Sequence, residues 1–191
     1  AYGMGGVKQD YSKAREWYEK AAKQEYADAQ FNLGFMYYQG EGVKQDYSKA
    51  TEWYKKAAKQ EHADAQFSLG NMYRQGQGVK QDYSKTREWY EKAAKQEQAD
   101  AQFNLGVMYD QGDGVKQDYS KAREWYEKAA EQGLADAQSK LGVMYANGEG
   151  VKQDYSKARE WYEKAAKQGY ASAQYNLGYM YNHGEGVKQD Y

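Results

Sequence analysis

The sequence predicts an all-α fold, a right-handed α/α superhelical solenoid of five helix-turn-helix repeats, each 36 residues long. The tryptophans recur at this constant spacing, at Trp17, Trp53, Trp89, Trp125 and Trp161. A period of this length is typical of two-helix repeats that stack on their neighbours. The chain also holds 20 glycines and no proline, so glycine is left as the residue that ends each helix.

The period divides residues 1–191 into a single solenoid domain. We expect repeats at about 11–46, 47–82, 83–118, 119–154 and 155–190, with residues 1–10 as the remnant of a preceding repeat. No polar capping helix is evident at either end of the sequence. The uncapped termini therefore predict a tendency to end-to-end self-association.

The first helix of each repeat is expected to begin after an aspartate. In the first repeat, the Asp10 side chain can accept a hydrogen bond from an unpaired backbone N–H, and the helix then runs from about residue 11 to residue 24. Its apolar residues recur at helical spacing, at Tyr11, Ala14, Trp17, Tyr18, Ala21 and Ala22. We expect Trp17 and its equivalents to be buried, so that replacement by alanine costs about 3–5 kcal/mol.

The second helix is expected to run from about Ala27 to Gln39, with Leu33 and Met36 in its core stripe. Gly34 lies in the middle of it, where glycine costs roughly 0.5–1 kcal/mol relative to alanine. Because this glycine recurs in every repeat, we expect it to allow close packing against a neighbouring helix, with a tryptophan ring as the candidate neighbour.

The turn between the two helices differs among the repeats. Gly133 and Gly169 stand where a left-handed C-cap favours glycine, whereas Glu25, Glu61 and Glu97 occupy the same position in the other three repeats. We expect either backbone strain on the order of 1 kcal/mol at these glutamates or a different turn geometry.

Composition argues against several classes of function. Lysine and arginine number 27 against 28 acidic residues, and the two signs are interleaved, so the concentrated basic face of a nucleic-acid-binding protein is missing. There is no apolar run of about 18 residues, so we expect no membrane insertion. The chain begins at Ala1 and shows no signal peptide, which leaves both a cytoplasmic protein and one secreted after processing open.

No catalytic, cofactor-binding or metal-binding residues are predicted. The chain has no cysteine, and its two histidines, His62 and His183, lie in different repeats. Metal ligands normally cluster, and a Ser-His-Asp arrangement needs a histidine beside its partners. The carboxylates lie among lysines and arginines on predicted solvated helix faces, where no apolar pocket raises a pKa for acid–base catalysis.

The motif "AxxxLGxMYxxGxGVxxDxxKAxxWYxKAA" recurs along the whole chain. One copy is formed by Ala65, Leu69, Gly70, Met72, Tyr73, Gly76, Gly78, Val79, Asp82, Lys85, Trp89, Tyr90, Lys92, Ala93 and Ala94. This pattern resembles the Sel1-like repeat, a subclass of the tetratricopeptide-type α/α solenoids. Thr86 and Ser139 depart from it. The resemblance implies an adaptor or scaffold that binds other proteins, in bacterial signalling and host contact or in eukaryotic quality control, and not an enzyme.

Discrimination between partners is expected at positions that differ among the repeats. One set reads Phe35, Asn71, Val107, Val143 and Tyr179; a second reads Tyr38, Arg74, Asp110, Ala146 and Asn182; a third, at the inter-helix turn, reads Tyr26, His62, Gln98, Leu134 and Tyr170. From these we select Phe35, Tyr38, Asn71, Arg74, Asp110 and Tyr179 as candidate partner-binding residues. Unconstrained solvent positions are the alternative interpretation.

A second candidate surface is the charged face of the first helix, with Lys13, Glu16, Lys20 and their equivalents. Its regular charges could hold an extended peptide of complementary charge, which predicts an affinity that falls steeply with salt.

The sequence thus favours a non-catalytic scaffold or adaptor for a protein or peptide partner, and the neutralisation of one toxin or effector enzyme stays open within that class. One alternative is a consensus-like or engineered repeat array with no specific partner. Its basis is the six copies of "GVKQDY". The identical Lys8-Gln9 and Ser12-Lys13 of every repeat exceed what helix packing requires, and they otherwise point to recent duplication or to a repeated ligand contact. A second alternative is a hydrolase, because a cysteine-rich branch of the resembled family has been linked to β-lactam hydrolysis; this chain lacks its disulfides.

Overall fold

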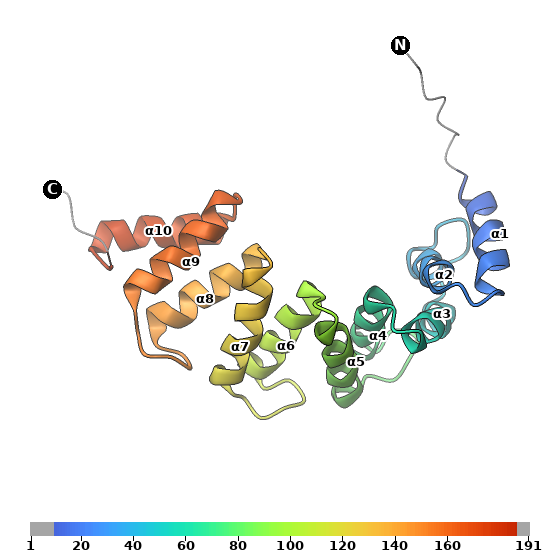
Figure 1. Cartoon of the computed structure of the whole chain (residues 1–191), viewed down its shortest axis with the longest axis horizontal. Helices are drawn as coiled ribbons and strands as arrows, with labels where there is room; N and C mark the ends of the chain where they lie inside the picture. Colours follow the sequence, from blue (N-terminus) through green and yellow to red (C-terminus); the bar gives the residue numbers. More distant parts are fainter. Residues whose placement is uncertain (1–9, 187–191) are drawn as a thin grey trace, which may run out of the picture. The chain divides into compact units, whose positions relative to one another are not determined.

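A computed structural model describes residues 10–186, and this part of the chain is helical with no strand. The helices are α1 (Tyr11–Ala22), α2 (Ala27–Gln39), α3 (Tyr47–Lys59), α4 (Ala63–Gln75), α5 (Tyr83–Lys95), α6 (Ala99–Gln111), α7 (Tyr119–Glu131), α8 (Ala135–Asn147), α9 (Tyr155–Lys167) and α10 (Ala171–His183). They follow one another as antiparallel pairs (Figure 1). The predicted all-α repeat architecture is confirmed.

The chain divides into two compact units, residues 1–92 and 93–191. The first holds α1 to α4 and most of α5, and the second holds the remainder of α5 and α6 to α10. The single solenoid domain predicted for residues 1–191 stays a prediction. The remnant expected at residues 1–10, apart from Asp10, lies outside the described residues, as does the end of the repeat expected at 155–190.

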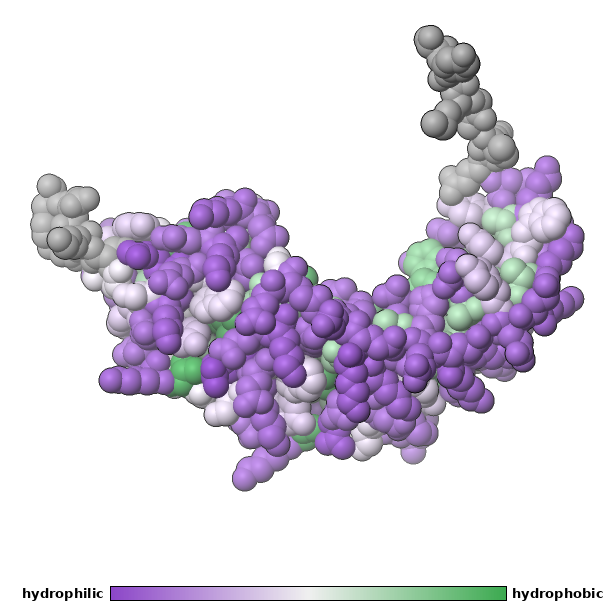
Figure 2. Space-filling view, viewed as in Figure 1, coloured by the Kyte–Doolittle hydropathy of each residue, from purple (hydrophilic) through white to green (hydrophobic). Residues whose placement is uncertain are grey.

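Within each unit, neighbouring repeats are joined by the packing of a second helix on the next first helix. The contact of α2 with α3 is more extensive than that of α1 with α2, and the contact of α8 with α9 is more extensive than that of α7 with α8. Buried leucine, methionine and alanine side chains fill these interfaces, and hydrophilic residues cover most of the visible surface (Figure 2). In the described residues, no helix has the length and apolar character needed to cross a membrane.

The expected helix starts are confirmed. The backbone N–H of Lys13 donates to the Asp10 carboxylate at 3.0 Å, and the aspartates that precede α3, α5, α7 and α9 accept the same bond. α2 begins at Ala27 and ends at Gln39, as predicted, whereas α1 ends at Ala22, two residues before the expected end.

The helical glycine of α2, α4, α6 and α8 packs against a tyrosine ring, so the expectation of a tryptophan neighbour was wrong. A Cβ atom added to Gly34 would lie 2.6 Å from the ring of Tyr54, and one added to Gly106 would lie 2.5 Å from the ring of Tyr126. The same contact joins Gly70 to the Tyr90 ring. Each of these tyrosines is almost completely buried, because the missing side chain lets the two helices approach closely.

The tryptophans lie nearer the surface than predicted. Trp17 is 66% exposed and its four equivalents are half-buried. In every repeat a lysine three residues later covers the ring; the Lys20 ammonium, for example, lies 4.1 Å from the centre of the Trp17 ring. The cost of about 3–5 kcal/mol expected for removing a buried aromatic side chain therefore applies to the buried tyrosines that follow the last four tryptophans, Tyr54, Tyr90, Tyr126 and Tyr162.

The three turn glutamates keep the geometry of the glycine turns, which confirms the first of the two alternatives. Glu25, Glu61 and Glu97 have φ angles of 62°, 61° and 61°, and Gly133 has a φ of 92°. This left-handed region disfavours residues that carry a Cβ atom, so backbone strain is present at each of the three glutamates.

We expect Gly106→Ala to lower the free energy of unfolding by about 1–3 kcal/mol, because the new methyl group forces the buried Tyr126 ring out of place. Gly178→Ala is the matched control, since Gly178 lies at the same repeat position with no neighbouring atom within 4 Å. There the better helix propensity of alanine should stabilise the protein by about 0.5–1 kcal/mol. Thermal unfolding followed by circular dichroism separates the two; equal effects would contradict the role of the tyrosine contact.

Glu61→Gly should relieve strain and raise the free energy of unfolding by up to about 1 kcal/mol. Gly133→Ala is the reverse change, and it should cost about 1 kcal/mol through the backbone alone because nothing lies within 4 Å of the added Cβ atom. Urea titration measures both. A loss of stability in Glu61→Gly would mean that the left-handed turn imposes no strain.

Candidate functional site

The second helix of each repeat carries one face whose residues change from repeat to repeat, which we call the variable face. Its positions are spaced i, i+3 and i+6, so they line one side of the helix. It consists of Asn32, Phe35 and Tyr38 in α2; Ser68, Asn71 and Arg74 in α4; Asn104, Val107 and Asp110 in α6; Lys140, Val143 and Ala146 in α8; and Asn176, Tyr179 and Asn182 in α10.

The variable face meets the hydroxyl group of the buried tyrosine in the following first helix. The Tyr90 hydroxyl donates to Asn71 Oδ1 at 2.5 Å, and the Tyr126 hydroxyl donates to Asp110 Oδ2 at 3.2 Å. Burial raises the pKa of Tyr90 to about 12, an effect that the nearby Arg74 charge opposes. Burial and then the Asp110 carboxylate raise the pKa of Tyr126 as well. Both hydroxyl groups therefore stay protonated at neutral pH and act as donors.

The residues around each tyrosine hydroxyl give each repeat a different local chemistry. Beside Tyr126, Lys140 Nζ lies 3.3 Å from Asp110 Oδ2, so an ion pair closes the site. At the equivalent position in the first unit, the ring of Tyr38 lies 5.4 Å from the ring of Tyr47, and an aromatic pair fills the space. The variable face thus offers ionic and aromatic contacts on one repeated scaffold.

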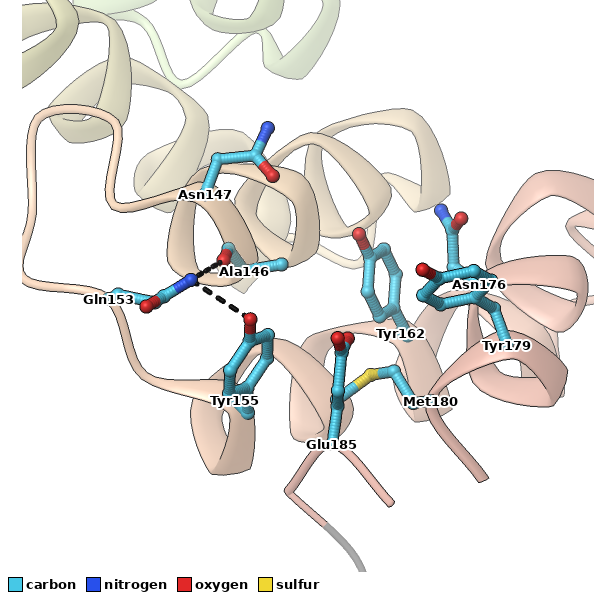
Figure 3. A pocket seen from close by; sticks show the side chains of 9 residues that line it. All are labelled: Ala146, Asn147, Gln153, Tyr155, Tyr162, Asn176, Tyr179, Met180 and Glu185. Carbon is cyan, nitrogen blue, oxygen red and sulfur yellow. Dashed lines mark hydrogen bonds between the residues drawn. The ribbon is translucent and has the colours of Figure 1, made fainter. Parts of the chain in front are cut away.

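At Tyr162 the site is open. The equivalents of Asn71 and Asp110 here are Val143 and Ala146, which have no side-chain hydrogen-bonding group. A pocket of about 530 Å³ lies beside the Tyr162 ring, between α8, α9 and α10 (Figure 3). Burial, together with the charge of Glu149, raises the pKa of Tyr162 to about 12. Its hydroxyl is therefore a donor at neutral pH.

The structure places the six selected residues of the variable face in two kinds of environment. Phe35 and Tyr179 are 39% and 47% exposed, and each lines a pocket, of about 310 Å³ for Phe35 and 530 Å³ for Tyr179. Tyr38, Asn71, Arg74 and Asp110 are half-buried. Asn71 and Asp110 are held by tyrosine hydroxyl groups, so they are not the unconstrained positions of the alternative interpretation.

The charged face of the first helices lies on different elements from the variable face, and contacts within the chain hold part of it. Lys13 Nζ lies 3.8 Å from the Asp10 carboxylate, and the equivalents of Lys13 lie over a tyrosine ring of the preceding repeat. Lys20 covers Trp17, as described above, and Glu16 is exposed.

In the third variable set, His62 and Gln98 cap a second helix, and His62 and Tyr170 join neighbouring repeats. His62 Nδ1 accepts from the backbone N–H of Ala65 at 3.3 Å, and His62 Nε2 lies 3.3 Å from Asp28 of the preceding repeat. The Tyr170 hydroxyl donates to Asp136 at 2.6 Å in the corresponding bridge. Within residues 10–186, no group of three or more potential metal ligands comes together.

Two sets of glutamines at equivalent repeat positions hold the structure together, although the sequence had not singled them out. The Gln102 side chain donates to the Ala94 carbonyl at 3.2 Å and accepts from Gln132 of the next repeat at 2.8 Å. In the loops, Gln117 donates to the Asp110 carbonyl at 2.7 Å, which satisfies the last turn of α6. The constant glutamine of "KQD" is therefore explained by capping. The available signal was a polar residue kept unchanged in neighbouring repeats.

The chain belongs to the Sel1 repeat family, whose model matches residues 1–26, 27–62, 63–97, 99–134, 135–170 and 171–191. The matches at 27–62, 99–134 and 135–170 each pair a second helix with the next first helix, and these are the pairs that pack most extensively. From residue 27 onward, the matches keep the expected period of about 36 residues, but each begins at a second helix and not at a first helix. Sel1 repeat proteins generally mediate contacts between proteins and typically serve as scaffolds without catalytic activity.

Solved structures of this fold include a protective antigen of uropathogenic Escherichia coli, at 45% identity and a TM-score of 0.93, over 95% of this chain and 39% of the antigen. This chain thus spans well under half of that protein. A Sel1 repeat protein from Oxalobacter formigenes is 39% identical, with a TM-score of 0.87 over 94% of this chain and 74% of its own. An immunity protein from Pseudomonas aeruginosa is 27% identical, with a TM-score of 0.56 over 87% and 62%. No curated protein sequence matches the chain.

We expect Gln102→Ala to lower the free energy of unfolding by about 1–3 kcal/mol, because it leaves the buried Ala94 carbonyl and the Gln132 amide without their partner. Gln174→Ala provides the control, since Gln174 makes the equivalent bond to the Ala166 carbonyl but is exposed. Chemical unfolding of the two variants should differ by at least about 1 kcal/mol. Equal losses would show that burial of the glutamine is unimportant.

Proposed function

We propose that this protein is a non-catalytic scaffold that binds a protein or peptide partner through the variable face of its second helices. The observation that supports this most strongly is the contrast between the buried positions of the repeat and the surface positions beside them. The buried glycine, tyrosine and glutamine positions are the same in neighbouring repeats, whereas the adjoining surface positions carry different side chains. A constant scaffold with changing surface chemistry suits selective recognition.

The exposed aromatic side chains on this face favour protein contact. Phe35 and Tyr179 stand partly exposed at pocket rims, and aromatic residues are enriched among those that dominate binding energy. The raised pKa values of Tyr90 and Tyr126 belong to hydroxyl groups that donate structural hydrogen bonds, and both values lie above neutral pH. Such groups suit contact and packing better than proton transfer.

A narrower role, the neutralisation of one toxin or effector enzyme, fits within the same proposal. The similarity to an immunity protein from Pseudomonas aeruginosa supports it. The surface that such a partner would occupy is the variable face. The charged face of the first helices is the competing surface, and it predicts binding that weakens steeply as salt rises.

Replacing Phe35, Tyr38 and Arg74 together with alanine should weaken binding to an isolated partner by at least about tenfold, because exposed aromatic and arginine side chains dominate interfaces. The control replaces Lys13, Glu16 and Lys20 with alanine. It should leave the affinity within about twofold, because exposed charges contribute little at moderate salt.

Isothermal titration calorimetry at two salt concentrations measures both variants, and circular dichroism verifies that each is folded. If the variable-face variant kept its full affinity for the partner and the charged-face variant lost affinity, the partner-binding surface would lie on the first helices.

A further inference from the structure

The pocket beside Tyr162 combines aromatic walls with acidic and amide groups. We propose that it is a binding site for a basic side chain, the ammonium group of lysine or the guanidinium group of arginine, presented by a protein partner. The inference rests on the proposed scaffold function and specifies the chemistry that one part of the variable face recognises.

Acceptor groups converge on the pocket. The Glu185 side chain and the Tyr162 hydroxyl point into the same space, and the Asn176 amide lies at the rim (Figure 3). A second carboxylate lies close by, since Glu149 accepts from the Asn147 amide at 3.1 Å and its charge acts on Tyr162. Two carboxylates beside a half-enclosed space favour a cation and repel an anion.

The walls of the pocket are suited to the rest of a basic side chain. The rings of Tyr155, Tyr162 and Tyr179 and the side chain of Met180 line it. Aromatic faces attract ammonium and guanidinium groups, and methylene stems pack against apolar surface. The chain already uses this contact, since the Lys164 ammonium lies 3.8 Å from the centre of the Trp161 ring.

The preceding repeat shows the same site with a cation already in place. Ala146 and Asn176 of the pocket correspond to Asp110 and Lys140 one repeat earlier. There the Lys140 ammonium lies 3.3 Å from the Asp110 carboxylate, beside the Tyr126 hydroxyl that donates to the same carboxylate. The open pocket is therefore the arrangement that remains when the chain supplies neither the lysine nor its aspartate. Glu149 corresponds to Glu185, so an acidic residue is kept at the loop position of both sites.

The basic groups nearest the pocket are engaged elsewhere. Arg159 lies 3.4 Å from Glu163 and donates to the Gly186 carbonyl at 3.1 Å. Lys157 lies over the Tyr145 ring, and the His183 ring stacks on Tyr179 at 4.0 Å. The carboxylate of Glu185 forms no ion pair with any of the described residues and is left available to an incoming cation.

The test uses pentapeptides of alanine with a central arginine, lysine or citrulline, titrated into the isotopically labelled full chain and followed by nuclear magnetic resonance. Citrulline has the shape of arginine without its charge. We expect the arginine and lysine peptides to shift the Asn176 side-chain amide signal with a Kd on the order of 1 mM, and citrulline to bind at least about tenfold more weakly.

Two variants make the test specific. Ala146→Asp with Asn176→Lys rebuilds the ion pair of the preceding repeat, keeps the net charge and should weaken peptide binding at least about tenfold. Glu185→Gln keeps the shape of the pocket and should weaken binding about threefold to tenfold. Circular dichroism confirms that both variants are folded.

The inference is overturned if citrulline binds as well as arginine, if the rebuilt ion pair leaves binding unchanged, or if no peptide shifts the amide signal at millimolar concentration. These results leave the scaffold function standing, since that depends on the partner affinity of the variable-face variant.

Discussion

The close contact between a helical glycine and a buried tyrosine ring joins α2, α4, α6 and α8 to the first helix that follows each of them. Because Gly106 has no side chain, the Tyr126 ring lies directly on the α6 backbone, and α7 packs closely against α6. Glycine in the middle of a helix lowers stability because of its poor helix propensity. The contact also buries a whole aromatic ring, and the stabilisation from that burial is several times larger than the cost of the glycine. It also determines where the tyrosine hydroxyl emerges, namely beside the variable face. The tyrosine hydroxyl thus links the packing of the helices to the surface that we propose for partner binding.

That geometry explains why the surface residues differ in their freedom to change. A residue that faces the tyrosine hydroxyl, such as Asn71 or Asp110, satisfies a polar group and influences stability as well as recognition. Where alanine stands instead, at Ala146, the position offers no hydrogen-bonding side chain and a pocket lies beside the tyrosine ring. Sequence change at a few positions thus converts a closed structural site into an open one while the underlying repeat stays the same.

Much of the architecture could be predicted because periodic features determine it. The 36-residue period, the aspartate caps and the bounds of α2 follow from local sequence. The sequence could not predict whether Trp125 or Tyr126 is the buried ring, because both residues belong to one apolar stripe. The position of the neighbouring helix determines which of the two rings is buried. The buried Gln102 was missed for a similar reason, because its two partners belong to separate helices. Of the site, the variable positions were predictable, whereas the pocket depends on side chains that three helices bring together.

The central claim is that recognition resides in the differences between repeats on the variable face. It is tested most directly by the affinity of the partner for a chain in which all five second helices carry the variable-face residues of α6, namely Asn104, Val107 and Asp110. We expect this uniform chain to fold and to lose partner binding. Binding at the original affinity would contradict it, because a surface made of identical repeats would then be sufficient.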